Sequence, residues 1–273
     1  KNIDVFQCAE VGNKICKEMR EAGGGGVPMR DERTGKYPLS SLLSLTSILL
    51  SSPAFPQSFT VLGGMQYLIA LILPCTSPLY INSEYMHTLL RIMRIGMIEG
   101  SVLTDPGVSP TLVKFLVSML TECLNKDSLV QVLQILDRLS THPAHRSLLM
   151  QLSIFNRVIA LYLYAWEYKD HRLLFPIYAL MSRFMSEHTF RLQLHAHFSL
   201  HNDLPSLLEV FKEEHSHIVT GEIKACTLII IRAMLESEGI GEMIVVSGFL
   251  RSVLQGSLGS KEEEVRSLSL DCL

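Results

Sequence analysis

The stretch VLGGMQYLIALIL, residues 61–73, decides how the rest of the chain is interpreted. Gly63 and Gly64 interrupt one helical pattern, and apolar residues then recur at helical spacing, which predicts a helix–turn–helix. The same order recurs: a small residue, an apolar residue, and another apolar residue four positions later. Counted from Gly64, it returns at intervals of about 43 to 49 residues, at Gly107, Ser153, Ser199 and Gly248. A helical period of this length predicts an all-α solenoid built of repeats.

The composition supports a densely packed helical interior. Hydrophobic residues make up 48% of the 273 residues and charged residues only 19%, which suits helices that are buried on more than one side. No apolar run reaches the ~18 residues that a membrane span requires, because Lys224 and Arg232 interrupt the longest one, residues 223–235. We therefore expect no membrane insertion.

The charge and the cysteine content disfavour several kinds of partner. A net charge of −3 and an isoelectric point of about 6.4 do not favour nucleic acid or a membrane surface. The six cysteines are scattered and form no C-x-x-C pair, which argues against a disulfide framework or a zinc site. We therefore expect a reducing compartment, the cytoplasm or the nucleus, and neither a metal nor another cofactor.

The chain divides into a first helix, a loop and a long helical array. Residues 1–22 predict an amphipathic helix that ends a preceding repeat, and residues 23–36 predict a flexible loop that is rich in glycine and charge. A phosphate-cradling role for this loop is disfavoured, because the lysine and the Ser/Thr of a P-loop are missing. Residues 37–273 predict the repeat array, with an incomplete last repeat. Because the chain begins at Lys1 and ends within a helical pattern, we expect a fragment of a larger protein.

Helical periodicity dominates the array, and proline and glycine breaks separate its segments. The predicted helices cover residues 39–51, 64–73, 83–98, 110–125, 128–140, 146–166, 171–186, 190–199, 204–214, 222–236, 248–255 and 261–273.

Four segments of the array resemble armadillo repeats. VLGGMQYLIALIL and VSGFLRSVLQG (residues 246–256) are similar to the Gly-apolar-x-x-Leu helix of that family. SLLSLTSILLSS (residues 41–52) and VLQILDRLSTH (residues 132–142) are similar to the following helix, which lines the binding groove in that family. The resemblance covers roughly five units and implies a right-handed superhelical solenoid; a HEAT-like array is the alternative. Ser153 and Ser199 replace the glycine of the family, and its groove-lining asparagine is absent.

Arginines take the place of that asparagine. Alignment of the groove-type helices puts Ser47 and then four arginines at or within one residue of its position: Arg94, Arg138, Arg183 and Arg232. With packed helices about 8–10 Å apart, the four guanidiniums would span roughly 30 Å, which an extended peptide covers with about nine residues. Because a guanidinium fork suits carboxylates and phosphates, the pattern predicts a site for an acidic or phosphorylated segment. The alternative is that these arginines only stabilise helix C-termini, where the helix dipole attracts cations.

Aromatic residues are densest between residues 162 and 168. Tyr162, Tyr164, Trp166 and Tyr168 are spaced by two, so some of them must reach the surface of a helix. Tyr164, Trp166 and Tyr168 are candidates for contact with a partner, and packing between repeats is the alternative.

No residue pattern predicts catalysis or metal binding. Histidines cluster at positions 195, 197 and 201 and again at 215 and 217, but an H-x-H pair points to opposite sides of a helix. Nucleophile-elbow, zinc-protease and P-loop motifs are all missing from the sequence. The acidic run at positions 262–264 is interpreted as the solvated start of the last helix.

The sequence therefore favours a non-catalytic protein-interaction scaffold over an enzyme. It would bind a peptide or disordered acidic segment of a partner protein along an arginine-lined groove, within a larger assembly, with no small-molecule substrate. Two alternatives stay open: a nucleic-acid-associated helical-repeat protein, which the small number of cations disfavours, and a regulatory helical domain of a larger enzyme complex.

Overall fold

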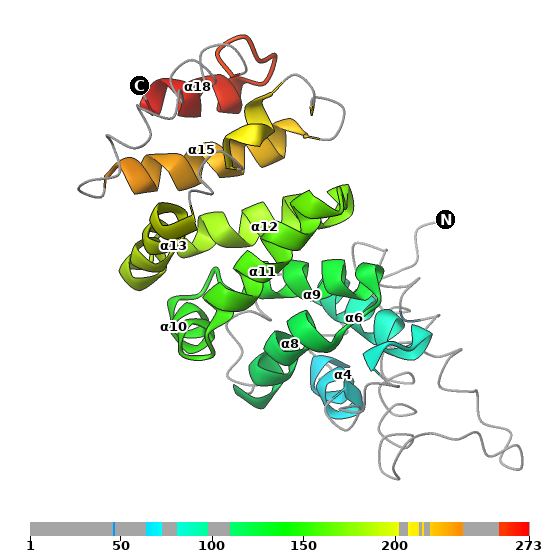
Figure 1. Cartoon of the computed structure of the whole chain (residues 1–273). Coiled ribbons are helices and arrows are strands. Elements are labelled where there is room, and N and C mark those ends of the chain that lie inside the picture. The colour runs from blue at the N-terminus through cyan, green and yellow to red at the C-terminus, as the bar shows by residue number, and fades with distance from the viewer. Residues whose placement is uncertain are drawn as a thin grey trace, which may run out of the picture. The chain divides into compact units, whose positions relative to one another are not determined.

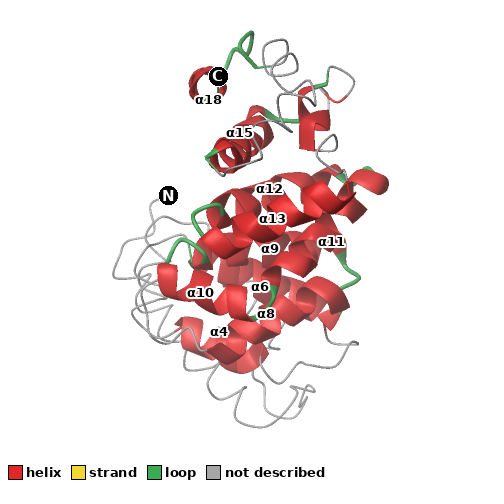
Figure 2. Cartoon of the chain, turned by 60° about the vertical axis from the view of Figure 1, so that its left-hand side comes forward, coloured by secondary structure: helices red, strands yellow, loops and turns green. Residues whose placement is uncertain are grey.

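Helices form every regular element of the described residues (Figures 1 and 2), which confirms the predicted all-α class. The structure is a computed structural model, and it describes residues 46, 64–72, 81–97, 110–201, 207–212, 215, 219–236 and 257–272. The chain forms two compact units, Lys1–His142 and Pro143–Leu273. The predictions for residues 1–22, 23–36 and 248–255 concern residues outside the described ranges, as does the predicted helix at 39–51 apart from the buried Thr46.

The first unit is organised by one helix pair. Its described helices are α4 (Gly64–Ile72), α6 (Glu84–Gly96), α8 (Pro110–Glu122) and α9 (Lys126–Leu139). Helix α6 packs against α9, and α4 and α8 each cover one member of this pair. Leucine, isoleucine and methionine recur at helical spacing on the facing sides, so Leu89, Met93, Leu133 and Leu136 are completely buried.

Asparagine and serine side chains fix the starts of α6 and α9. Ser83 caps α6 by accepting a hydrogen bond from the N–H of Met86 at 3.2 Å, and Asn125 caps α9 by accepting from Ser128 at 3.1 Å. The Asn82 Oδ1 atom also accepts from the backbone N–H groups of Leu124 and Asn125, at 2.6 and 3.2 Å. One amide oxygen thus ties the beginning of α9 to the beginning of α6.

The second unit stacks helices in the same way around a more aromatic core. Helix α12 packs between α11 and α15, and α18 packs on the other side of α15. Phe184 and Phe190 stack with ring centroids 5.2 Å apart, and Phe155 meets Phe190 edge-on at 5.3 Å. The described elements are α10 (Pro143–Gln151), α11 (Ile154–Glu167), α12 (His171–Phe184), α13 (His188–His201), the 3-10 turn η1 (Glu209–Phe211), α15 (Gly221–Leu235) and α18 (Glu263–Asp271).

Three predicted helices of the second unit differ from the structure. The single helix predicted over residues 146–166 is wrong, because α10 and α11 are separate and their axes bend by 81°. Ser199 was expected at a break, but α13 continues through it to His201. The helix predicted over residues 204–214 is described only in part, and there the backbone tightens into η1.

The bend between α10 and α11 is made by Ser153. Its backbone is left-handed, with φ 56° and ψ 41°, and its N–H donates to the carbonyl of Met150 at 3.0 Å. A left-handed residue cannot continue an α-helix, so the apolar periodicity runs on across the junction while the chain turns. This explains why periodicity alone predicted one helix here.

Lys169 makes a second left-handed turn, at the end of α11. Its φ is 50°, its N–H donates to the carbonyl of Trp166 at 3.3 Å, and the next N–H, of Asp170, donates to Ala165 at 2.9 Å. These two bonds form a Schellman motif, in which glycine is the usual left-handed residue.

No single described helix is long and apolar enough to cross a membrane. Helices α10 and α11 meet the length and composition criteria only as a pair, and the bend at Ser153 separates them.

Helix α18 contacts α15 near both of its ends. The thiol of Cys272 donates to the carbonyl oxygen of Leu228 at 3.6 Å, and burial raises the pKa of this thiol to about 11. At the other end, the carboxylate of Glu262 lies where a Cβ on Gly221 would be placed, so a glycine at the first residue of α15 permits this approach. The acidic residue therefore lies at the positive end of the α15 dipole.

Relieving the left-handed strain should stabilise the second unit. We expect Ser153→Gly and Lys169→Gly each to raise the free energy of unfolding by about 0.5–1 kcal/mol, because glycine adopts positive φ without steric cost. Urea denaturation followed by circular dichroism measures the change. Ser153→Ala is the matched control: it removes the hydroxyl but keeps the Cβ, and it should leave the midpoint nearly unchanged. A lower midpoint for Ser153→Gly than for the parent would contradict the assignment.

Candidate functional site

Four helices carry an arginine in the last turn, and we call them the ladder helices: α6, α9, α12 and α15. The arginines are those predicted from the sequence: Arg94, Arg138, Arg183 and Arg232. The described helices α4, α8, α10, α11 and α18 have no basic residue in the last turn. A general attraction of cations to helix C-termini would act on all of these helices. Among these described helices, the arginines therefore occur in the ladder helices specifically, and not at helix C-termini in general.

The burial pattern places the four arginines in two registers. The same buried turn is marked in the four helices by the pairs Leu89–Leu90, Val132–Leu133, Ile177–Tyr178 and Thr227–Leu228. Counted from these pairs, Arg94 and Arg232 share one helical position, and Arg138 and Arg183 share the next one. Adjacent positions differ by about 100° around a helix. The one-residue offset between the arginines in the sequence alignment is therefore real: the side chains of Arg138 and Arg183 leave their helices in a different direction from those of Arg94 and Arg232.

In the first unit, Arg94 and Arg138 are half-buried and in contact. An Nη1–H of Arg138 donates to the backbone carbonyl of Arg94, in the last turn of α6. Burial lowers the pKa of both guanidiniums below the usual arginine value. Repulsion adds to this effect, from Arg91 on Arg94 and from Arg94 on Arg138, and only Asp137 opposes it for Arg138. The carbonyl contact makes Arg138 a structural cap as well as a ligand candidate.

In the second unit, the two ladder arginines have different surroundings. Arg183 is exposed in the last turn of α12. Arg232 donates from Nη1 to the Oδ2 atom of Asp271 at 2.9 Å, and both side chains are about half exposed. This ion pair joins α15 to α18, so part of the charge of Arg232 is already compensated within the unit.

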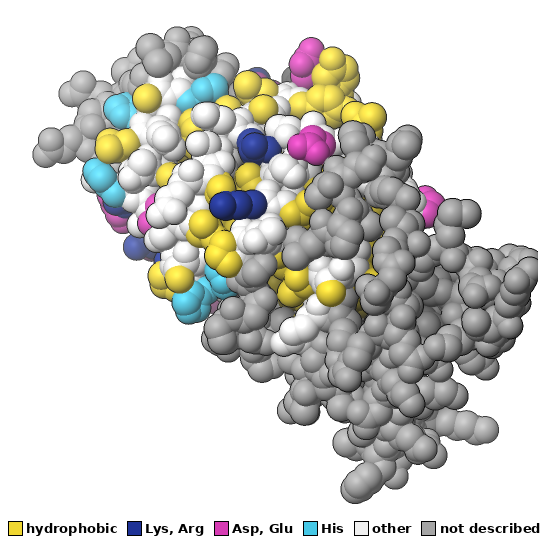
Figure 3. All heavy atoms as spheres, turned by 90° about the horizontal axis from the view of Figure 1, so that it is seen from below, with side chains coloured by type: hydrophobic (Ala, Val, Ile, Leu, Met, Phe, Trp, Pro, Cys, Tyr) yellow, Lys and Arg dark blue, Asp and Glu magenta, His cyan; other side chains and the backbone are white. Residues whose placement is uncertain are grey.

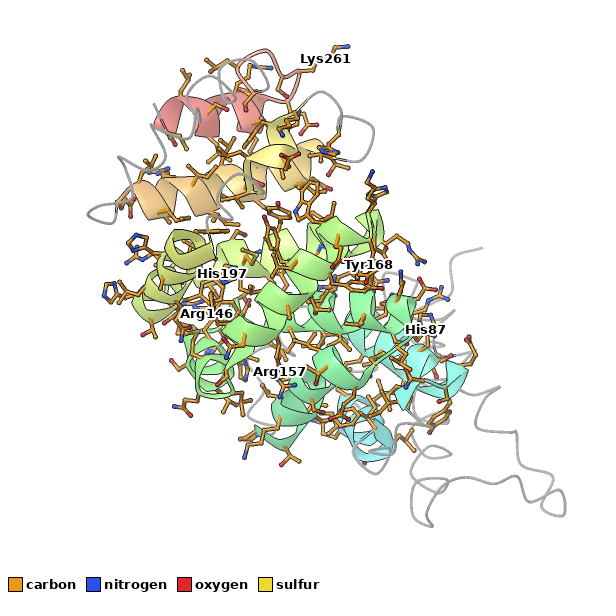
Figure 4. The ribbon with its side chains drawn as sticks, viewed as in Figure 1. His87, Arg146, Arg157, Tyr168, His197 and Lys261 are labelled. Carbon is orange, nitrogen blue, oxygen red and sulfur yellow. The ribbon has the colours of Figure 1, made fainter. Side chains whose placement is uncertain are left out.

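The aromatic candidates separate into a surface pair and a core residue. Tyr164 and Tyr168 are exposed by 36% and 61%, and their ring centroids lie 4.7 Å apart; Figure 4 labels Tyr168. Trp166 is half-buried, and its Nε1–H donates to the hydroxyl of Tyr178 at 3.2 Å. Burial raises the pKa of this hydroxyl well above the usual tyrosine value. Trp166 therefore contributes to packing within the unit, while the tyrosine pair faces solvent.

The histidines are not assembled into a metal site among the described residues. No group of three or more His, Cys, Asp or Glu side chains there could hold a metal ion. His215 lies 3.1 Å from the Oε2 atom of Glu209 and meets the Trp166 ring edge-on, at a centroid distance of 5.4 Å. His197, labelled in Figure 4, packs edge-on against Phe155. These contacts give both histidines packing roles.

The sequence analysis did not single out two polar residues of the first unit. Arg91 lies one helical turn before Arg94 on α6, and it is exposed. Asn82 joins the starts of two ladder helices, as described above. The spacing of Arg91 and Arg94 was a usable signal, because residues three apart share a helix face.

Comparison with known proteins identifies the architecture. No family model matches the chain, and no curated protein matches it. Among solved structures, the designed armadillo repeat protein YIII(Dq)4CqI matches with a TM-score of 0.69 and 12% identity, over 96% of this chain and 98% of that one.

The fold is that of armadillo repeats. A second match is a computationally designed armadillo repeat protein for modular peptide recognition, with a TM-score of 0.66, 11% identity, and coverage of 95% of this chain and 97% of that one. The armadillo-like architecture expected from the sequence is thereby confirmed, and at these identities the likeness concerns the fold alone.

Arg138 and Arg183 differ in burial, so their removal should change the stability of the fold by different amounts. We expect Arg138→Ala to lower the free energy of unfolding by about 1–2 kcal/mol, because the Arg94 carbonyl loses a charged donor. Arg183→Ala, at an exposed site, should change it by less than about 0.5 kcal/mol. Urea denaturation of both variants provides the measurement. Equal effects of the two substitutions would contradict the capping role of Arg138.

Proposed function

We propose that this chain is a non-catalytic scaffold that binds an extended segment of a partner protein along its ladder helices. The single observation that carries the proposal is the arginine in the last turn of all four ladder helices and its absence from five other described helices. A protein of the same fold, designed for modular peptide recognition, gives independent support for a peptide as the ligand.

The chemistry of the ladder points to an acidic segment. Guanidinium groups present paired N–H donors that match the two oxygens of a carboxylate. Arg94 and Arg183 are the members best suited to contact a partner, because no described carboxylate pairs with Arg94 and Arg183 is exposed. Arg138 and Arg232 have contacts within their units and would contribute less binding energy.

The distribution of charge supports a protein segment over nucleic acid. On the face shown in Figure 3, dark-blue basic side chains stand apart from one another, and some of them lie beside magenta acidic side chains. Binding to a nucleic acid backbone requires many cations close together, and the chain has a net charge of −3. A few arginines at defined spacing are better matched to the discrete carboxylates of a peptide.

Charge reversal on the ladder should weaken peptide binding. The probe is a fluorescein-labelled pool of peptides of about nine residues, rich in Asp and Glu, titrated with the full chain and followed by anisotropy. We expect the double variant Arg94→Glu/Arg183→Glu to bind the pool at least roughly tenfold more weakly, and added salt to weaken binding by the parent chain.

A matched control separates the ladder from net charge. Lys114 on α8 and Lys261 before α18, which is labelled in Figure 4, are both exposed, so the double variant Lys114→Glu/Lys261→Glu makes the same change in charge at other sites. This variant should bind like the parent. Unchanged affinity of the ladder variant, or tighter binding of a single-stranded RNA oligomer than of the peptide pool, would count against the proposal.

A further inference from the structure

Two polar stripes lie on neighbouring ladder helices of the first unit. Residues one or two turns apart on α6 and on α9 share a helix face, and the two helices pack together. His87, labelled in Figure 4, lies near the start of the α6 stripe, and its Nδ1 atom is 3.4 Å from the hydroxyl of Ser128 at the start of α9. Beyond this contact the α6 stripe contains Arg91 and Arg94, and the α9 stripe contains Gln131, Gln134 and Arg138.

The two stripes hold more positive charge than the described residues around them neutralise. Arg91 lies close enough to Arg94 to repel it, and Arg94 repels Arg138. Asp137 is the carboxylate that acts on Arg138, and no ion pair joins Arg91, Arg94 or Arg138 to a carboxylate of the described residues. Three guanidiniums held together in this way are stabilised by any anion that enters between them.

Buried polar atoms without partners lie on the same two stripes. The Nε atom of Arg94 and the Oε1 atoms of Gln131 and Gln134 are inaccessible to solvent, and each lacks a hydrogen-bond partner among the residues that the structure describes. Groups of this kind cost free energy unless a ligand or water satisfies them. A glutamine amide turned about its last bond presents N–H₂ in place of oxygen, so both glutamines can act as donors to an anion.

We propose that Arg91, Arg94 and Arg138, with Gln131 and Gln134 beside them, form a clamp for the phosphoryl group of a phosphorylated serine or threonine in the bound segment. The inference rests on the proposed function, since the scaffold supplies the extended segment that carries the phosphate. It goes further, because it places the phosphorylated residue of the partner segment against the stripes of α6 and α9.

The number of donors favours phosphate over carboxylate. A carboxylate has two oxygens and a single negative charge, whereas a phosphoryl group has three terminal oxygens and a charge of about −1.5 to −2 at pH 7. Three neighbouring arginines therefore suit the larger charge and the three oxygens of a phosphoryl group better than they suit a single carboxylate. The Arg138 contact with the Arg94 carbonyl uses one of its five N–H groups and leaves the others for the ligand.

The test compares three peptide pools on the full chain. The pools are fluorescein-labelled degenerate peptides with a central phosphoserine, glutamate or serine, and binding is followed by anisotropy. We expect the phosphoserine pool to bind roughly ten- to a hundredfold more tightly than the serine pool, and more tightly than the glutamate pool.

Arg91→Gln is the principal variant, because Arg91 is exposed and its loss should not disturb folding. This variant should bind the phosphoserine pool roughly tenfold more weakly while its affinity for the serine pool is unchanged. Lys261→Gln removes one positive charge outside the stripes and should keep the full preference for phosphate. Inorganic phosphate and a single-stranded RNA oligomer serve as competitors, and neither should displace the phosphoserine pool when equimolar with it.

Several outcomes would overturn the clamp. Equal affinity for the three pools, or an Arg91→Gln variant that keeps the phosphate preference, would remove it while the scaffold proposal stands. Displacement by equimolar inorganic phosphate would reassign the site to a free anion, and displacement by RNA would reassign it to nucleic acid. Failure of all three pools to bind would defeat the scaffold proposal and the clamp together.

Discussion

The lateral burial of each ladder helix between its neighbours is the interaction on which the rest of the structure depends. Within the first unit, α6 and α9 bury leucine, isoleucine and methionine against each other, and within the second unit α15 is enclosed by α12 and α18. Each fully buried side chain contributes about 1.5–3 kcal/mol, and no helix of this kind could bury its apolar stripe alone. The surface of each ladder helix that its neighbours leave uncovered is one narrow polar stripe, which solvent or a partner can contact.

That narrowness explains why the ladder arginines differ from one another. A stripe one or two residues wide must supply both the polar contacts between neighbouring helices and any contacts with a partner. Arg138 and Arg232 reach along the stripe to an adjacent helix, to the Arg94 carbonyl and to Asp271. Arg183, in the last turn of α12, is more exposed than Arg138. Substitutions at the four positions should therefore differ in how they divide their effect between stability and binding.

The sequence predicted the helices well because the apolar stripes are nearly continuous. The predicted helices at 64–73, 83–98, 110–125 and 171–186 each agree with a described helix to within a few residues. The predicted helix 146–166 ran across Ser153, although the repeat motif includes that residue, because the apolar period continues past the left-handed serine. For the candidate site, alignment of the groove-type helices in the sequence identified the four arginines. Their contacts did not, because the acceptor of Arg138 is a backbone carbonyl that no side-chain pattern can indicate.

The contact between α15 and α18 can be followed chemically, through the reactivity of the buried thiol of Cys272. Because its pKa is raised to about 11, almost none of it is thiolate at neutral pH, and alkylating reagents react with the thiolate. The thiol also donates to the Leu228 carbonyl and is largely buried, so separation of α18 from α15 would make it more accessible to a reagent. The alkylation rate of Cys272 thus reports how often this helix opens. A bound partner that crosses both helices would slow that reaction without touching the sulfur.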